Sequence, residues 1–415
     1  MKSHICIAAI SVSCLSSAMA SGTLQGWGSN SWGQLAVPGD LGEPTSIAVG
    51  GIHVLAIRPS GGVVGWGASG QGQISIPSAA GSAVQVAAGE YHSAARLASG
   101  AVICWGAGTV STNTNWNYGQ SIVPSDLGTA RDLACGAHHT VAIRTNGTVR
   151  CWGRNSTGQL NVPAGLAPAI SAAGGGGFTG VILNDGSVRC WGEGIYAQNN
   201  PPQDLGACQS ISLGWHHGVV LRVDGVVRCW GRNFEGQCNV PSSLGPVVSI
   251  AAGYSHSVAL SASGRVVAWG FNADGQVNVP PLLAPASALV AGGHSTFVIA
   301  GPRLSDSDGD QVADPYDNCV AVANPGQADC DADGIGDACV IAAGGTDVNI
   351  NGIPDSCECI ADIFVDGRVD GGDLGGLLAQ WGPSVVTTVA DLNRDGLVNG
   401  GDLGILLSNW GPCSN

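Results

Sequence analysis

Oxygen-bearing side chains recur at alternate positions in the last quarter of the chain, which is rich in Asp, Asn and Gly from Asp306 onward. Ca²⁺ takes six to eight oxygen ligands, and a binding loop supplies them from positions 1, 3, 5, 7, 9 and 12, with a backbone carbonyl at position 7. Four stretches follow this spacing, the second only as far as position 9. They are Asp306, Asp308, Asp310, Val312, Asp314 and Asp317; Asp329, Asp331, Asp333, Ile335 and Asp337; Asp347, Asn349, Asn351, Ile353, Asp355 and Glu358; and Asp391, Asn393, Asp395, Leu397, Asn399 and Asp402. The spacing predicts Ca²⁺ as a cofactor that orders this region, whereas a solvated acidic linker would need no spacing.

The acidity of the chain is confined to this region. Residues 21–301 carry eleven Arg, no Lys and eleven acidic residues, whereas residues 302–415 carry three Arg and nineteen acidic residues. The last region therefore has a formal charge of −16, and Lys2 brings the whole chain to −15. Phosphate contacts need clustered Lys and Arg, so the balance argues against a nucleic-acid partner.

A second set of chemically capable residues repeats through the first three quarters of the chain. A Trp-Gly pair recurs at intervals of 39 residues, with one interval of 47, at Trp27, Trp66, Trp105, Trp152, Trp191, Trp230 and Trp269. A Gln follows each Trp by seven residues, except in the long interval, and His precedes most of them by thirteen. A residue that recurs in every repeat serves the repeat. We therefore expect Trp to fill the core between repeats, and Gln and His to satisfy buried backbone groups.

The elements that position these residues are short strands. Each repeat contains apolar or alternating runs separated by two-residue turns such as Asn146-Gly147, and a further run before a Pro predicts a fourth strand. Four strands in about forty residues are typical of a propeller blade. The chain begins with half a repeat, from Thr23, and the last repeat is the other half, ending at Ile299. Pairing the two halves predicts an all-β, seven-bladed β-propeller closed by its first and last strands.

The repeat resembles the regulator-of-chromosome-condensation repeat family over Thr23 to Ile299. The shared frame is G-x-x-H-S-x-A-L, then D/N-G-x-V-x-x-W-G-x-N, then G-Q-x-x-V-P. The resemblance implies a seven-bladed propeller used mainly for protein–protein recognition. The founding members are nuclear nucleotide-exchange factors that bind chromatin, whereas exported bacterial relatives, including enzyme-inhibiting ones, are closer to this chain.

Positions that differ between repeats are the candidates for contact with a partner, because loops on a rigid scaffold commonly carry function. They lie before the repeated His, after the Trp-Gly pair and in an insertion of eight residues. They are Trp32, Glu90, Tyr91, Trp116, Tyr118, His138, Tyr196, Trp215, His216, Phe234 and Tyr254. These residues predict a non-catalytic protein that binds a protein or glycan, the other interpretation being ordinary loop variation.

A carbohydrate-active enzyme on a propeller scaffold is the alternative function. Its candidate acids are Glu90, Asp132, Glu193 and Glu235, but nothing in the sequence brings two of them together. No residue is therefore predicted to be catalytic.

The acidic region resembles two calcium-binding families. Asp306 to Cys339 is similar to a thrombospondin type 3 repeat, through D-N-C at 317–319, N-P-x-Q at 324–327 and D-G-x-G-D-x-C at 333–339. That resemblance implies a Cys319–Cys339 disulfide. Asp362 to Trp410 is a tandem duplication, offset by 29 residues, that resembles a dockerin, with a short helix after each loop ending at Trp381 and Trp410. A dockerin implies a cohesin-like partner. This tandem departs from the family at Phe364, in a ligand position, and at the paired glycines of the partner-reading positions.

The first twenty residues predict a secretory signal, with Lys2, an apolar run from Ile5 to Leu15 and an A-x-A site that ends at Ala20. We therefore expect a protein that is secreted, periplasmic or at the cell surface, without a membrane span. Thirteen cysteines would remain, and outside the cytoplasm they favour disulfides. The predicted domains are a signal peptide at 1–20, the propeller at 21–301, the thrombospondin type 3-like repeats at 302–360 and the dockerin-like tandem at 361–415.

Overall fold

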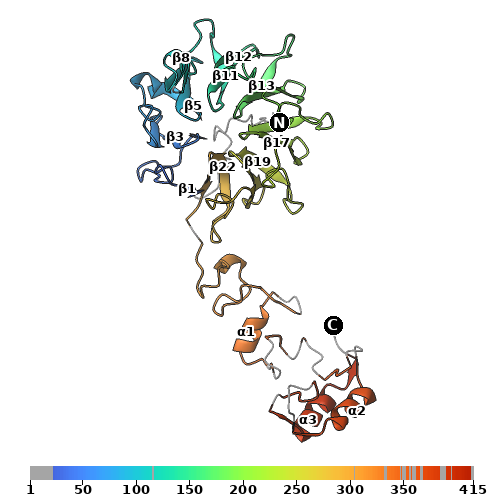
Figure 1. Ribbon diagram of the computed structural model, residues 1–415. Coiled ribbons are helices and arrows are strands. Elements are labelled where there is room, and N and C mark those ends of the chain that lie inside the picture. The colour runs from blue at the N-terminus through green and yellow to red at the C-terminus, as the bar shows by residue number, and fades with distance from the viewer. Residues whose placement is uncertain are drawn as a thin grey trace, which may run out of the picture. The chain divides into compact units, whose positions relative to one another are not determined.

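The computed structural model divides the chain into two compact units, Met1–Pro302 and Arg303–Asn415, which we describe separately (Figure 1). The structure describes residues 22–114, 116–302, 304–330, 334–345, 347, 352–354, 357, 361–364, 368–383, 389–393 and 395–412. The predicted secretory signal at residues 1–20 lies outside the described residues.

The first unit is mostly β and is built from repeated three-stranded antiparallel sheets, here called blades 1 to 7. Blade 1 holds β2 (Ser46–Val49), β3 (His53–Ile57) and β4 (Val63–Gly67); blade 2 holds β5 (Ala83–Ala88), β6 (His92–Leu97) and β7 (Val102–Gly106). Blade 3 holds β10 (Ala130–Cys135), β11 (His139–Arg144) and β12 (Val149–Gly153); blade 4 holds β13 (Ala169–Gly174), β14 (Phe178–Leu183) and β15 (Val188–Gly192). Blade 5 holds β16 (Cys208–Leu213), β17 (His217–Arg222) and β18 (Val227–Gly231); blade 6 holds β19 (Val247–Ala252), β20 (His256–Ser261) and β21 (Val266–Gly270). Blade 7 joins both ends of the unit, as β22 (Ala286–Gly292), β23 (Ser295–Ala300) and β1 (Thr23–Gly28).

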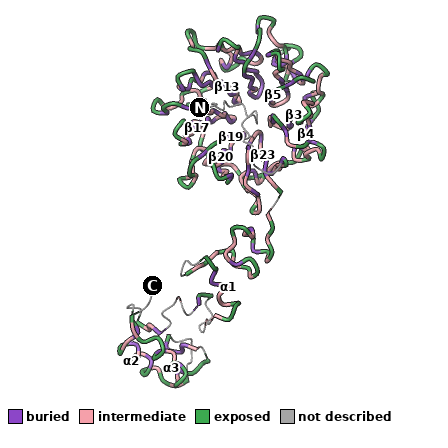
Figure 2. The backbone as a smooth tube through the Cα atoms, turned by 180° about the vertical axis from the view of Figure 1, so that it is seen from behind, coloured by how far each residue is buried: buried purple, intermediate pink, exposed green. Residues whose placement is uncertain are grey.

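The first strands of successive blades lie side by side, and β22 of blade 7 lies beside β2 of blade 1. Figure 1 shows the blades arranged around a centre, and Figure 2 shows that buried residues follow the strands while the outer loops are exposed. The core fills the spaces between neighbouring blades. One core cluster joins Leu24, Phe297 and Ile299 of blade 7 to Val54 and Trp66 of blade 1. Burying one such large side chain contributes roughly 1.5–3 kcal/mol to stability.

The predicted fourth strand is wrong, because the run before each Pro folds as consecutive turns. In the loop after β1, Asn30 Oδ1 accepts a hydrogen bond from Leu35 N, and Gly33 N donates to Asn30 O. Asn155 Oδ1 accepts from Leu160 N in the same way in the loop after β12. Because the loop satisfies most of its backbone donors within itself, it does not pair as a strand with its neighbour.

The insertion of eight residues between blades 2 and 3 forms a small hairpin of β8 (Ser111–Thr114) and β9 (Asn117–Tyr118). A short 3₁₀ helix, η1 (Ser78–Ser82), precedes β5. Trp116, at the turn of the hairpin, has a left-handed backbone with φ of 70°. This conformation is costly for a bulky residue and is held here by a hydrogen bond from Gln120 Nε2 to Trp116 O.

The second unit consists of loops and short helices. Its elements are η2 (Asp314–Tyr316), α1 (Asp337–Ala342), β24 (Arg368–Val369), α2 (Gly371–Ala379), β25 (Gly382–Pro383), β26 (Leu397–Val398), α3 (Gly400–Ser408) and β27 (Gly411–Pro412). The two halves of the tandem pair with each other, because β24 of the first half pairs with β27 of the second, and β25 of the first pairs with β26 of the second. Leu377 of α2 and Leu406 of α3 lie in one core cluster and are fully buried.

The helices of the tandem end earlier than predicted, so Trp381 and Trp410 lie beyond them and are about half exposed. Pro383 and Pro412 stand two residues after these Trp residues, inside the short strands β25 and β27. Gly382 and Gly411 have positive φ of 128° and 135°, and the Pro after each disfavours helical backbone at that Gly, so neither helix can continue past its Trp. No helix among the described residues is long and apolar enough to cross a bilayer.

Candidate functional site

The repeated Trp and Gln residues are architectural. Every one of the seven Trp indoles donates from Nε1 to the backbone carbonyl of the Gln in the preceding blade, over 2.7–3.1 Å. In the last of these bonds Trp27 donates to Gln276, which ties the first strand of the unit to its other end. Each Gln side chain in turn accepts, at Oε1, the backbone N–H two residues before it, over 2.8–3.1 Å. The predicted structural role of Trp and Gln is thereby confirmed.

Five repeated His residues form a second architectural relay. The Nε2 of His53, His92, His139, His217 and His256 lies 2.9–3.1 Å from a Ser or Thr hydroxyl of the next blade. That hydroxyl donates to the carbonyl of the repeated Gln, so Nε2 must carry the proton. The other nitrogen, Nδ1, has no partner in any of the five. Burial lowers the pKa of His53, His139 and His256 to about 3 and that of His217 to about 4, so these imidazoles are neutral.

The two blades that lack this His support the same conclusion. Phe178 takes the His position in blade 4, and the next blade has Gly218 in place of the hydroxyl. Ser295 takes the His position in blade 7, and blade 1 has Val54 in place of the hydroxyl. Since donor and acceptor disappear together, the His residues serve the interface between blades rather than a metal or a reaction.

The positions that differ between blades are collected at one end of the strands. The residue after the first repeated Gly donates its backbone N–H to a carbonyl of the next blade over 2.8–3.1 Å, as from Glu90 to Ala137, from Trp215 to Tyr254 and from Tyr254 to Gly293. The residue after each Trp-Gly pair donates to the residue before the His position of its own blade, as from Arg154 to His138. Backbone bonds that do not depend on the side chain therefore hold the variable side chains on a rigid surface, here called the variable face.

A first aromatic cluster on this face lies on blades 2 and 3. The ring centroids of Trp116 lie 4.8 Å from Tyr91 and 5.5 Å from His138, and Tyr118 lies 5.4 Å from His138. The Arg154 guanidinium stands over the Tyr118 ring at 5.2 Å. Burial, and then the charge of Arg154, lower the pKa of His138 to about 4, so its ring is neutral. The sequence predicted these four aromatic rings as contact residues, and the structure brings them together.

A second aromatic cluster lies on blades 4 to 7. Tyr196 packs edge-on against His216 at 5.3 Å and against Phe234 at 5.6 Å, and Arg232 stands over Phe234 at 5.0 Å. The cluster continues through Trp215, Tyr254, His294 and Phe271, each ring within 6.3 Å of the next. Phe234 is 74% exposed, which makes it the most exposed ring of the two clusters.

The centre of the variable face opens into a cavity of about 190 Å³ lined by the first strands of all seven blades. Its walls are aliphatic residues, Ala and Gly, with Cys135 and Ser212, and Glu90, Trp215 and Tyr254 stand at its mouth. The Tyr254 hydroxyl donates to Glu90 Oε2, and Trp215 packs edge-on against Tyr254 at 4.6 Å. Burial raises the pKa of Glu90, although the hydrogen bond from Tyr254 opposes this shift.

Trp32 stands apart from the two clusters, and residues beyond the predicted contact set join them. Trp32 is 58% exposed, and none of the ring contacts of the two clusters includes it. His294, Phe271, Arg154 and Arg232 belong to the clusters although none was predicted as a contact residue. Ser295 holds the position of the repeated His in blade 7, because it pairs with Gly28 as His53 pairs with Gly67. His294, one residue earlier, therefore lies on the variable face.

The candidate acids of an enzyme do not form a pair. Glu193 Oε2 lies 3.0 Å from His216 Nδ1, and Glu235 Oε1 accepts from Arg232 at 2.6 Å. Asp132 is buried between blades, where it accepts from Gln85 Nε2 and Ala172 N, and burial raises its pKa to about 6. Each of these acids therefore has a partner of its own, and Asp132 serves the blade interface.

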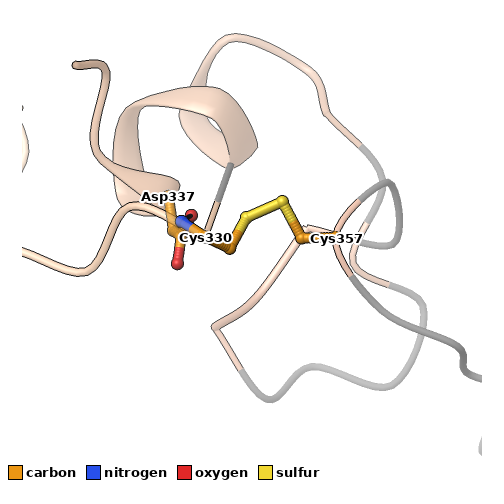
Figure 3. A group of neighbouring side chains, drawn as sticks. All are labelled: Cys330, Asp337 and Cys357. Atoms are coloured by element: carbon orange, nitrogen blue, oxygen red, sulfur yellow. Dashed lines mark hydrogen bonds between the residues drawn. A yellow bond between two sulfur atoms is a disulfide. The ribbon is translucent and has the colours of Figure 1, made fainter. Parts of the chain in front are cut away.

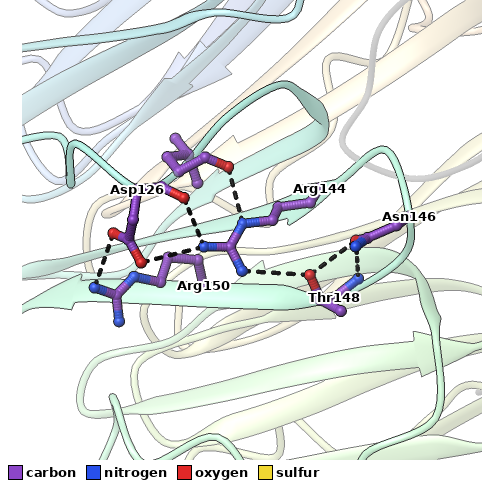
Figure 4. A network of polar contacts seen from close by, with 6 residues as sticks. Asp126, Arg144, Asn146, Thr148 and Arg150 are labelled. Carbon is purple, nitrogen blue, oxygen red and sulfur yellow. Dashed lines mark hydrogen bonds and ion pairs between the residues drawn. The ribbon is translucent and has the colours of Figure 1, made fainter.

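Ion pairs at the opposite end of the strands are structural. Figure 4 shows Asp126 between Arg144 and Arg150, at 3.4 and 3.2 Å, where Arg144 also donates to Asp126 O and Thr148. Arg58 with Asp40 and Arg228 with Asp204 repeat the arrangement in other blades. These pairs fasten the exposed loop to the turn of the following hairpin and contribute little individually.

The predicted calcium ligands of the second unit are only partly described. Asp331, Asp333, Asn349, Asn351, Asp355 and Glu358 lie outside the described residues. Oxygens of Asp306, Asp308 and Asp310 lie within 4.8 Å of one another. Buried carboxylate oxygens without a hydrogen-bond partner are Asp308 Oδ2, Asp317 Oδ2, Asp329 Oδ1 and Asp391 Oδ1. Such atoms are costly unless a cation or water satisfies them, so the donor set fits a hard cation.

The remaining described ligand candidates organise their own loops. Asp314 accepts from Ser307 N, Asp337 from Cys330 N, and Asp395 from Leu397 N. Asn399 and Asp402 form a reciprocal cap at the start of α3, as Asp370 and Asp373 do for α2. The predicted backbone ligands Ile335, Ile353 and Leu397 have exposed side chains, whereas Val312 is half-buried.

Three cysteine pairs are joined as disulfides. One is Cys319–Cys339, the pair that the thrombospondin type 3 resemblance implies. The others are Cys229–Cys238 within blade 5 and Cys330–Cys357, shown beside Asp337 in Figure 3. Because its sulfurs are bonded to each other, the Cys330, Asp337 and Cys357 group offers no thiolate to a metal. Burial raises the pKa of Cys135 and Cys151 to about 12, which makes these free thiols unreactive.

Comparisons with known proteins identify the repeat and the fold. The regulator of chromosome condensation (RCC1) repeat matches residues 83–111, 130–159, 208–237 and 247–276. No curated protein sequence matches the chain. Prp20p of Saccharomyces cerevisiae, whose binding to Gsp1p and histones has been described, is 19% identical, with a TM-score of 0.59 over 70% of this chain and 94% of its own. Yeast RCC1 (Prp20) bound to Kap60 is 21% identical, with a TM-score of 0.60 over 69% of this chain and 90% of its own. Human WBSCR16 is 19% identical, with a TM-score of 0.55 over 68% of this chain and 99% of its own. The matches support the RCC1 repeat family and the propeller fold.

Proposed function

We propose that this RCC1-repeat chain is an exported, non-catalytic binding protein. Its seven blades close into one ring, its variable face recognises a protein or glycan, and its calcium-ordered second unit is a spacer or anchor. The observation that carries the proposal is the pair of aromatic clusters, which the repeat itself does not require. Aromatic residues with polar neighbours on rigidly held loops are typical of recognition surfaces.

Ring closure has three independent supports. β1 pairs along its whole length with β23, from Thr23 with Ala300 to Gly28 with Ser295. The Trp27 to Gln276 bond repeats the contact that joins all other neighbouring blades. Finally, β22 lies beside β2. A closed ring leaves no sheet edge unpaired between blades, and it keeps the variable face stiff.

A calcium role for the second unit is supported by the unpaired buried oxygens of Asp308, Asp317, Asp329 and Asp391. Asp306 and Asp310 would complete the first site, and Asn393 and Asp395 the last. Calcium bound there would neutralise the repulsion between neighbouring carboxylates and would couple metal binding to folding of the loops. The expected affinity is that of extracellular modules, about 10⁻⁴–10⁻³ M.

Export is supported by the three disulfides, because such bonds persist mainly outside the reducing cytoplasm. The signal-like residues that end at Ala20 point to the same compartment. For the dockerin-like tandem, a cohesin-like partner has an exposed apolar surface to contact. Leu378, Trp381, Leu407 and Trp410 are each about half exposed, at equivalent positions of the two halves.

Affinity capture from the native surface or secreted fraction tests the recognition role. The full chain with calcium is compared with a Trp116→Ala/Phe234→Ala variant, which removes one ring from each cluster. An Asp126→Asn variant, altered at the opposite end of the strands, is the matched control. We expect a partner that the wild type and Asp126→Asn retain and that the double variant loses. Equal capture by all three proteins, or capture of nothing specific, would refute recognition by this face.

A further inference from the structure

Glu90 differs from every other acidic residue of the variable face. Glu193 is paired with His216, Glu235 with Arg232, and Asp274 with His294 at 3.1 Å. Among the described residues, no Lys, Arg or His forms an ion pair with Glu90. Its partner is the Tyr254 hydroxyl, from four blades further along the chain. The mouth of the central cavity therefore holds a half-buried carboxylate whose charge is balanced by no cation in the part of the chain that the structure describes.

Small residues at the equivalent positions of other blades leave space for the Glu90 side chain. The positions equivalent to Glu90 are Gly51, Ala137, Gly176, Trp215, Tyr254 and Gly293 in the other blades. A Cβ atom on Gly51 would collide with the Tyr254 hydroxyl and would lie 2.8 Å from Glu90 Cδ. A Cβ atom on Gly176 would lie 2.8 Å from Trp215 Cδ1. Four positions are thus small, and two of the glycines leave space that the three large side chains occupy.

We infer that this mouth binds a primary ammonium group on an alkyl chain, as in a lysine side chain of a protein partner, with Glu90 as the counter-ion and the Trp215 and Tyr254 rings as its walls. A carboxylate accepts hydrogen bonds from an ammonium, and aromatic rings attract cations and cover an alkyl stem. The cavity behind the mouth is aliphatic and, at about 190 Å³, smaller than the roughly 300–1,000 Å³ of most small-molecule sites. A single inserted side chain therefore suits this space better than a sugar or a nucleotide.

The inference rests on the proposed recognition function and names the chemistry at the centre of its face. In the complex, the ammonium would balance a charge that the free protein leaves desolvated and unpaired. Pairing of a buried charge is worth much more than pairing at an exposed rim, so one lysine of the partner would be an anchor. The two aromatic clusters would contact the partner around this anchor.

Calorimetric titration of the full, calcium-loaded chain with n-butylammonium, and with n-butanol as the uncharged counterpart, tests the inference. We expect saturable binding of n-butylammonium, and at least about tenfold weaker binding to Glu90→Gln, which corresponds to roughly 1.4 kcal/mol. Glu235→Gln is the matched control, because it removes an acid that already has a cation, and it should bind like the wild type. Glu90→Gln preserves an acceptor for Tyr254, so its thermal midpoint should not fall.

Three results would overturn the ammonium site. They are equal affinity for n-butanol, unchanged affinity in Glu90→Gln, and no binding to the wild type up to about 50 mM, beyond which an anchor contributes little. These failures are distinguishable from failure of the proposed function. If the Trp116 and Phe234 variant still loses its captured partner while n-butylammonium does not bind, recognition stands and the lysine anchor falls.

Discussion

The two units both repeat polar residues, but they use the repetition in opposite ways. In the propeller, each repeated donor has a repeated acceptor, as between the Trp152 indole and Gln120 O or between His139 and Thr179. In the second unit, repeated carboxylates leave buried oxygens without partners, as at Asp317 and Asp391. Repetition therefore indicates architecture where the repeated groups satisfy one another, and a ligand where they leave the same atom unsatisfied.

The same criterion separates residues within the propeller. Glu193, Glu235 and Asp274 are satisfied by partners on the protein, whereas Glu90 has no cation among the described residues. The His Nδ1 atoms also lack partners, but they are neutral and buried against glycines such as Gly89 and Gly136, without space for a ligand. An unpaired polar atom thus indicates a ligand only where it belongs to a charged group that no cation of the described residues balances.

Acid should have the largest effect, and it should act on the propeller. Five buried His residues have a pKa lowered from 6.5, to about 3 or 4 where a value is resolved, so the unfolded chain binds more protons between these values. Stability is complete above about pH 6.5 and is lost as pH falls below it. Asp132 opposes this loss of stability. Its pKa is raised from 3.8 to about 6, so between these values the folded chain binds one proton that the unfolded chain does not. The five repeated His residues less Asp132 leave a net of four protons, which gives a loss of about 5 kcal/mol per pH unit where all of them titrate. His138, whose pKa is also lowered by burial, adds to this loss, and Glu90, whose pKa is raised by burial, opposes it.

Urea midpoints measured between about pH 7 and pH 5, at constant m-value, check this expectation. His139→Phe is the control, because it removes one titrating group and should make the slope shallower by one proton. A stability that is flat across this range would contradict neutral, architectural His residues.

Calcium removal should have the next largest effect, and it should act only on Arg303–Asn415. With a Kd near 10⁻⁴ M, about 10 mM Ca²⁺ would stabilise the unit by roughly 3 kcal/mol for each site. We expect a chelator to make this unit susceptible to proteolysis while the propeller transition stays unchanged. Asp391→Asn weakens one carboxylate whose Oδ1 is unpaired, whereas Asp126→Asn alters an exposed ion pair of the propeller. Equal cleavage with and without calcium would refute the calcium role.

The sequence predicted features that follow from spacing, and it failed where local hydrogen bonds decide. Periodicity predicted the blades and the structural role of Trp and Gln, because six of the seven contacts recur at a fixed separation of 32 residues along the chain and the seventh joins its two ends. It did not predict that the side chains of Asn30 and Gln34 would accept hydrogen bonds from backbone N–H groups in the loop of the expected fourth strand. It predicted most of the rings that the structure brings together in the two clusters, but not His294 and Phe271. The pairing of Glu90 with Tyr254, from residues 164 apart, left no signal in the sequence.

Breaking one His relay should have a moderate effect on stability. His139→Phe removes the donor to Thr179, and we expect a loss of about 1–3 kcal/mol in the free energy of unfolding. Thr179→Val should cost a similar amount, because it also removes the donor to Gln159 O. The double variant should cost less than the sum, by about 0.5–3 kcal/mol, since the two groups interact. Strict additivity in this cycle would mean that the relay does not couple the two blades.

Changes on the variable face should affect stability least. Phe234 is 74% exposed, and it contacts Tyr196 and Arg232 only at the surface of its cluster. We expect Phe234→Ser to change the free energy of unfolding by no more than about 0.5 kcal/mol, as for most surface substitutions. Trp116→Ala should cost no more than about 1 kcal/mol, because Ala keeps a Cβ atom on the left-handed backbone and only the surface contacts of a 44% exposed ring with Tyr91 and His138 are lost. Chemical denaturation of both variants measures this, with Trp152→Phe as the contrasting architectural Trp. A loss from Trp116→Ala as large as that from Trp152→Phe would mean that the hairpin ring supports the fold, and that the distinction between architectural and contact residues fails there.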